Sequence, residues 1–212
     1  MEKRPRSSLV LGWVVGGLYL LRISLLIPAK LANHALSSTV EPVLSRMWGL
    51  VSVGVGVSSL TLYLFTAILF FIWSYLAQQN ARLLAPGAPF SHGPAVMVWS
   101  YFIPFVNLFL PYSAMREVFE ASDAAARADD DDLSRSGSGG PLLLGWWLAH
   151  IVISLLVTVM AALQTLSPSV ELDTLTVQAP FFFINGALSF AWCIYLSRLQ
   201  DRAIARQALP AS

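Results

Sequence analysis

His150 is the residue of this sequence best suited to proton transfer, because it lies inside an apolar segment. Asn185 and Cys193 of the next apolar segment are candidate neighbours for it. A polar side chain in such a place more often hydrogen-bonds between helices than takes part in catalysis. No G-x-S-x-G, H-E-x-x-H or supported S-x-x-K pattern accompanies it. The sequence therefore favours a non-enzymatic protein, and an intramembrane enzyme that uses His150 is the weakest of three hypotheses.

Backbone atoms could form a second kind of site between Trp99 and Asp123. Pro104 and Pro111 interrupt this apolar segment, and each lacks the N–H that would bond the carbonyl four residues earlier. The freed carbonyls belong to Ser100 and Asn107, which are seven residues apart and therefore share a helix face. Within a bilayer such carbonyls must be buried in protein or line a polar cavity. We expect either a kink held by hydrogen bonds or a polar site for an ion or small solute.

The same segment continues as an amphipathic helix that carries Arg116, Glu117 and Glu120. The leading hypothesis is a membrane binding or scaffolding module that presents this charged helix at the cytoplasmic interface. The alternative is a small transporter or channel subunit with its polar site at the broken helix. A water-accessible cavity that reaches Asn107 would favour the transporter, and a dry, fully packed bundle would favour the scaffold.

The composition places the whole chain, residues 1–212, in one integral membrane domain. Of the 212 residues, 56% are hydrophobic and 12% are charged, whereas soluble domains contain about 25% charged residues. The net charge of +1 and the lack of a basic stripe give no indication of a nucleic-acid partner. The single cysteine, Cys193, excludes an internal disulfide and a cysteine-based metal cluster. No metal or cofactor is expected, and the partners are the lipid bilayer and, as further candidates, other membrane proteins or a second copy.

The first apolar segment, from Leu9 to about Pro28, is long enough to cross a bilayer and too long for a signal peptide. Gly12 and Gly16 form a G-x-x-x-G pair, which predicts close approach of another helix. Arg22 lies in the distal half of this segment. It could pair inside the bundle, but we favour an outward, snorkelling side chain.

Further apolar segments run from Trp48 to about Leu76, from Leu142 to about Leu166 and from Phe181 to about Leu199. The last two carry polar residues at four-residue spacing, so each has a polar stripe, and the two stripes are expected to face each other. Residues 29–47 and the acidic, Gly- and Ser-rich residues 129–140 are expected to be linkers. The stripes consist of His150, Ser154 and Thr158, and of Asn185, Ser189, Cys193 and Ser197.

The number of spans follows from whether residues 95–111 cross the bilayer or return to the side from which they enter. If they return, four helices span, and of the thirteen basic residues only Lys30 and Arg46 lie outside, with Arg22 in the membrane. The positive-inside rule therefore predicts an all-α bundle of four spanning helices plus one re-entrant or interfacial helix, in the cell membrane with both termini cytoplasmic. Because the broken segment is long enough to cross, five spans are the alternative. The basic residues on the inner side are Lys3, Arg4, Arg6, Arg82, Arg116, Arg127, Arg135, Arg198, Arg202 and Arg206.

Several short motifs between Trp73 and His150 form a recognisable pattern. They are Trp73, Asn80, Gly87, Ser91, Ile103-Pro104, Asn107-Leu108, Pro111-Tyr112, Met115-Arg116-Glu117, Ala121-Ser122-Asp123 and Trp146-Trp147. In these motifs the sequence resembles the domain-of-unknown-function family 4328 of small bacterial multi-pass membrane proteins. The sequence departs from that family at residues 77–79, which are less basic, and at Ser91-His92, where the family has Ser-Pro. The resemblance implies a multi-pass protein of the bacterial inner membrane and implies no activity.

Overall fold

The computed structural model describes residues 5–38, 40–127, 139–166 and 174–208. Within these ranges the chain forms helices and connecting turns and no strand, which confirms the all-α prediction. The elements are α1 (Leu9–Ser24), α2 (Leu26–Ser38), α3 (Pro42–Leu84), α4 (Pro94–Ser100), the 3₁₀ helix η1 (Val106–Leu108), α5 (Leu110–Arg127), α6 (Gly139–Leu166) and α7 (Thr174–Gln207). Of the expected linker at residues 129–140, residues 129–138 lie outside the described ranges, and Gly139 and Gly140 begin α6.

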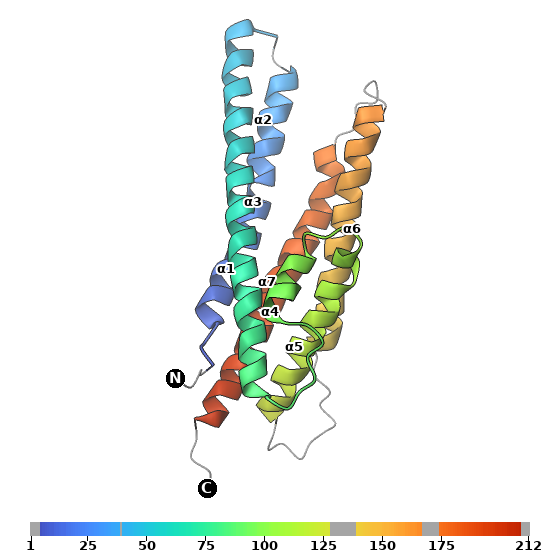
Figure 1. Ribbon diagram of the computed structural model, residues 1–212. Helices are drawn as coiled ribbons and strands as arrows, with labels where there is room; N and C mark the ends of the chain where they lie inside the picture. The colour runs from blue at the N-terminus through green and yellow to red at the C-terminus, as the bar shows by residue number, and fades with distance from the viewer. Residues whose placement is uncertain (1–4, 39, 128–138, 167–173, 209–212) are drawn as a thin grey trace.

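Four helical stretches are long and apolar enough to cross a membrane: Leu9–Ser38, Pro42–Leu84, Gly139–Leu166 and Val177–Gln207. Figure 1 shows both ends of the chain at the same end of the bundle, which we call the termini end. The α4–α5 segment leaves that end, turns, and comes back to it (Figure 1). The structure thus has the arrangement of four spanning helices and one returning, proline-broken segment.

The first span is longer than the sequence suggested, because the helix does not end at Pro28. α1 stops at Ser24, four residues before Pro28, since the missing N–H of Pro28 leaves the Ser24 carbonyl without its helical partner. The chain bends at Leu25 and continues as α2 to Ser38. The predicted linker over residues 29–47 is therefore wrong: only a short connection precedes α3, whose first turn is capped by the Glu41 carboxylate at Leu44 N (2.8 Å).

Small residues let α1 and α7 approach closely. A Cβ atom on Gly12 would clash with the hydroxyl of Ser197, and one on Gly16 would lie 2.8 Å from the ring of Phe190. Further along, a Cβ on Gly186 of α7 would contact the side chain of Ile23. This contact confirms the close approach that the G-x-x-x-G pair predicts, and α7 is the partner helix.

The two polar stripes behave differently from the prediction. On α7, Ser189, Cys193 and Ser197 are buried, and the hydroxyl of Ser189 accepts a hydrogen bond from Trp146 Nε1 (3.1 Å). On α6, Ser154 and Thr158 are exposed, and their hydroxyls donate to carbonyls of their own helix. The prediction that the two stripes face each other is therefore wrong for Ser154 and Thr158. A helical Ser or Thr can satisfy its hydroxyl at the carbonyl four residues back and needs no partner helix.

The termini end of the bundle is held by a buried amide. Gln200 of α7 is fully buried, and its Nε2 donates to the carbonyl of Ala77 (2.7 Å) and to Ser122 Oγ (3.1 Å). Its Oε1 accepts from Asn80 Nδ2 and from Ser8 Oγ, each at 3.4 Å. One side chain therefore links α3, α5, α7 and the residue that precedes α1.

The opposite half of the bundle is more open. In Figure 1 the α2–α3 pair and the upper parts of α6 and α7 diverge from each other. In the most apolar stretch of each of the four spans, only 11–33% of the residues are buried within the protein. Because a soluble protein would bury such surfaces, lipid is the natural environment for these spans.

Candidate functional site

The break predicted between α4 and α5 is present. Before Pro104 the α-helical ladder gives way to three-residue turns, with hydrogen bonds from Tyr101 N to Val98 O (3.3 Å) and from Phe102 N to Trp99 O (3.0 Å). Pro111 lies in the first turn of α5, where a missing N–H costs little. Phe105 has φ = 64°, a left-handed conformation that is strained for a residue with a side chain.

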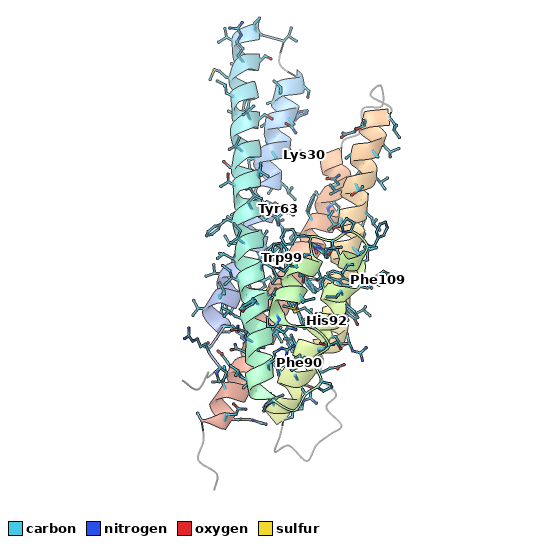
Figure 2. The ribbon with its side chains drawn as sticks, viewed as in Figure 1. Lys30, Tyr63, Phe90, His92, Trp99 and Phe109 are labelled. Atoms are coloured by element: carbon cyan, nitrogen blue, oxygen red, sulfur yellow. The ribbon has the colours of Figure 1, made fainter. Side chains whose placement is uncertain are left out.

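The bend carries exposed aromatic side chains. Phe105 is 82% exposed, Phe109 73% and Trp99 66%, and Figure 2 shows the last two beside the bend. Pro104 is exposed as well. An aromatic tip of this kind suits the hydrocarbon region or its border, so the bend has the character of a segment immersed in the bilayer.

An indole N–H from α6 donates a hydrogen bond to one backbone carbonyl of the bend. Trp147 Nε1 donates to the carbonyl of Leu108 (3.3 Å), and the Tyr101 ring packs edge-on against Trp147 with centroids 6.4 Å apart. The buried Ser100 hydroxyl donates back to Met97 O (2.6 Å). The sequence gave no signal that the N–H of Trp147 would reach the broken backbone.

Two buried polar atoms at the bend have no hydrogen-bond partner within the described residues. They are the side-chain oxygen Oδ1 of Asn107 and the hydroxyl of Tyr101. A buried polar atom without a partner costs about 1–3 kcal/mol. Asn107 therefore lies at the break, as the sequence predicts, but its side-chain oxygen Oδ1 accepts no hydrogen bond from the described residues.

His150 lies next to the bend through its contact with two indole rings. Its imidazole stacks on Trp147 (centroids 5.5 Å apart, 24° between planes) and on Trp146 (6.5 Å, 27°). Of the neighbours expected from the sequence, Cys193 is fully buried in the core, and the Oδ1 of Asn185 is buried and has no hydrogen-bond partner among the residues that the structure describes. This packing gives His150 the surroundings of a structural residue between aromatic rings.

Arg22 is the candidate that sequence reasoning undervalued. Its guanidinium lies over the ring of Tyr63 on α3, 4.5 Å from the centroid, and 5.9 Å from that of Tyr19. Since the helical span continues to Ser38, about 24 Å of helix separates Arg22 from that end. Instead of extending freely along α1, the guanidinium therefore packs against aromatic rings of the bundle.

Arg116 and Glu117 form a separate feature on α5 and do not join the residues of the bend. Arg116 Nε donates to Glu120 Oε1 (2.7 Å) in an exposed i,i+4 pair, and this hydrogen bond raises the pKa of the Arg116 guanidinium. Glu117 Oε2 accepts from the backbone N–H of Ser91 (3.1 Å). Glu117 thus fastens the turn before α4, while the Arg116 pair faces outward.

The same turn is fastened to α3. Gln78 Nε2 and Arg82 Nη2 both donate to the carbonyl of His92, at 2.7 and 2.6 Å. The Arg82 guanidinium also lies 4.6 Å from the centre of the Phe90 ring. Figure 2 shows Phe90 and His92 between α3 and the α4–α5 segment. These contacts hold the turn, and with it the returning segment, against α3.

No group of three or more His, Cys, Asp or Glu side chains placed to hold a metal ion occurs in the described part of the chain. No curated protein and no solved structure matches the sequence. The model of the family called domain of unknown function (DUF4328) matches residues 37–195. That range contains the α4–α5 break, the Trp146–Trp147 pair and His150, whereas Arg22 lies before it. Because the match covers well over half of the chain, this protein belongs to the DUF4328 family.

Proposed function

We propose that the protein is a non-enzymatic membrane module that binds an acidic group of another membrane component at Arg22. The observation that carries this proposal is a charge without a counterion. Among the residues that the structure describes, no carboxylate pairs with Arg22, whose neighbours are the rings of Tyr63 and Tyr19. An ionisable residue inside a membrane span is expensive and commonly marks a functional site.

The energetics support a missing partner. An arginine at the centre of a span costs about 2.5–3.5 kcal/mol on insertion scales. A cation–π contact such as that with Tyr63, at 4.5 Å, returns about 2 kcal/mol when it is desolvated. The aromatic ring thus offsets only part of the cost, and an anionic group from a lipid or a partner helix would complete the compensation.

The surroundings of Arg22 make it reachable. It lies in the last turn of α1, and the next helix, α2, runs beside α3 in the half of the bundle where this pair diverges from α6 and α7 (Figure 1). Tyr63 is 50% exposed, and Figure 2 shows it at this level of α3. By contrast, the charges of α5 pair with each other, Arg116 with Glu120 and Arg127 with Asp123, so this helix offers a weaker binding surface.

A photo-crosslinking amino acid at position 63 tests the proposal in native membranes. We expect an adduct with a lipid or a protein chain that is lost in Arg22→Gln and kept in Arg46→Gln, which removes one charge near the start of α3. The mass of the adduct distinguishes lipid from protein. Thermal unfolding in detergent checks that Arg22→Gln still folds. An adduct that forms equally well without Arg22 would refute binding at this residue.

A small transporter or channel subunit is the second candidate, and one observation favours it. Within the described residues, the Asn107 side-chain oxygen and the Tyr101 hydroxyl are buried at the broken helix without partners. Each is a hydrogen-bonding group that a passing ion or polar solute could use, as at other broken membrane helices. A cysteine at position 107 should then react with a membrane-impermeant thiol reagent. Asn107→Leu should abolish the phenotype of the gene without loss of folding; a structural kink would instead lose about 1–3 kcal/mol of stability.

A further inference from the structure

A groove with a volume of about 350 Å³ runs along the outer face of α7 near the termini end. Seven of its lining residues come from α7 and one from the start of α6. The small side chain of Ala191 lies between the bulkier Phe190, Ile194 and Tyr195, which makes room for an extended apolar group. The lining consists of Leu142, Phe190, Ala191, Ile194, Tyr195, Arg198, Leu199 and Arg202.

The groove changes character along its length. Its first part, from Phe190 to Tyr195, is aliphatic and aromatic, and its last part is cationic. Arg198 and Arg202 are one helical turn apart, so they project from the same face of α7. Both are exposed, and within the described residues neither is paired with a carboxylate; the Arg198 guanidinium rests 5.5 Å from the centre of the Trp13 ring.

The position of the two arginines matches a membrane surface. The apolar run of α7 begins at Phe181, and the helix rises about 26 Å from there to Arg198, which is close to the thickness of the hydrocarbon region. The apolar part of the groove therefore lies at acyl-chain depth and the arginines lie at the level of the headgroups. Basic pockets between membrane helices bind the headgroups of anionic lipids.

We propose that this groove binds one anionic phospholipid, with its phosphate between Arg198 and Arg202 and one acyl chain along Ala191. Arg206 continues the same row of α7 by one more turn but does not line the groove. It therefore provides a control with the same charge, on the same helix and near the same surface. This site is distinct from Arg22, because Arg22 is not among the residues that line the groove.

Native mass spectrometry of the full-length protein in detergent tests the site. The probes are phosphatidylglycerol and phosphatidylcholine with identical acyl chains, so only the headgroup charge differs. We expect preferential retention of phosphatidylglycerol. A basic residue near a membrane surface contributes about 1 kcal/mol, so Arg198→Gln and Arg202→Gln should each weaken this retention about fivefold. Arg206→Gln should leave it unchanged.

A second kind of variant tests the apolar part of the groove without changing its charge. Ala191→Leu keeps all three arginines but fills the apolar part, and it should weaken the retention of phosphatidylglycerol. Equal retention of both lipids, an equal loss in Arg206→Gln, or full retention in Ala191→Leu would each overturn the proposal. If the arginine variants fail to fold, the wild-type protein is measured with millimolar inorganic phosphate added. Displacement of the lipid by phosphate would show a site for free phosphate instead.

Discussion

Replacement of Gln200 by leucine should destabilise the termini end of the bundle. Gln200 is fully buried, and the hydrogen bonds of its amide join α3, α5, α7 and the segment before α1. Leucine has a similar volume, so the change leaves no large cavity. It removes the hydrogen bonds alone, which makes the cost of the network measurable.

The size of the effect follows from the geometry of the four bonds. The bonds from Nε2 to the Ala77 carbonyl (2.7 Å) and to Ser122 Oγ (3.1 Å) are well formed, and each contributes about 1 kcal/mol. The two bonds to Oε1 are 3.4 Å long, so each contributes at most about 0.5 kcal/mol, the low end of the usual range. The Ser122 hydroxyl keeps its bond to Val118 O (2.7 Å), which limits the penalty for lost partners. We therefore expect a loss of about 2–3 kcal/mol.

Thermal unfolding of the purified protein in detergent measures this loss. A change of 1 kcal/mol shifts the melting temperature of a chain of this size by about 2–4 °C, so Gln200→Leu should lower it by roughly 5–10 °C. Gln207→Leu is the matched control on the same helix, because exposed Gln207 makes one bond, to Leu84 O (3.0 Å). It should lose less than about 1 kcal/mol. If Gln200→Leu were no less stable than Gln207→Leu, the amide would not hold the helices together.

Three further predictions follow from the packing. Gly12→Ala should lose about 1–3 kcal/mol in the same assay because its Cβ would clash with α7, whereas Gly17→Ala should be tolerated because no atom lies within 4 Å of the new Cβ. Trp147→Phe should lose about 0.5–1.5 kcal/mol because the Leu108 carbonyl at the bend loses its donor. In intact cells, a cysteine at Ala208 should be protected from an impermeant thiol reagent and one at Ser38 should be labelled, in a background without the native cysteine; the reverse pattern would contradict the expected topology.

Features that depend on one or two neighbouring residues could be predicted from the sequence. The close approach of α1 to another helix follows from Gly12 and Gly16, because only residues without a side chain allow it. The break between α4 and α5 follows from Pro104, whose missing N–H ends the ladder wherever it falls. The four spans follow from hydropathy and length.

Features that depend on distant partners could not be predicted. Gln200 lies in a tail whose sequence is notable only for its arginines, and nothing near it in sequence shows that Ala77 and Ser122 surround it. Pro28 predicts the end of a span, but a proline in the first turn of a helix is compatible with helical structure that continues after it. Ser154 and Thr158 share a face, but that spacing does not distinguish a polar interface from hydroxyls bonded to their own helix.

The position of Arg22 shows how one local feature sets another. A long side chain near the end of a span normally snorkels along a lipid-facing side of its helix. α1 is instead packed on two neighbours, because Gly12 and Gly16 bring its backbone against α7, and Tyr19 packs against Phe70 of α3 with ring centroids 6.3 Å apart. Arg22, three residues after Tyr19, therefore faces the same side as that ring. The glycines thus fix the rotation of α1, and the rotation of α1 fixes the cation within the bundle.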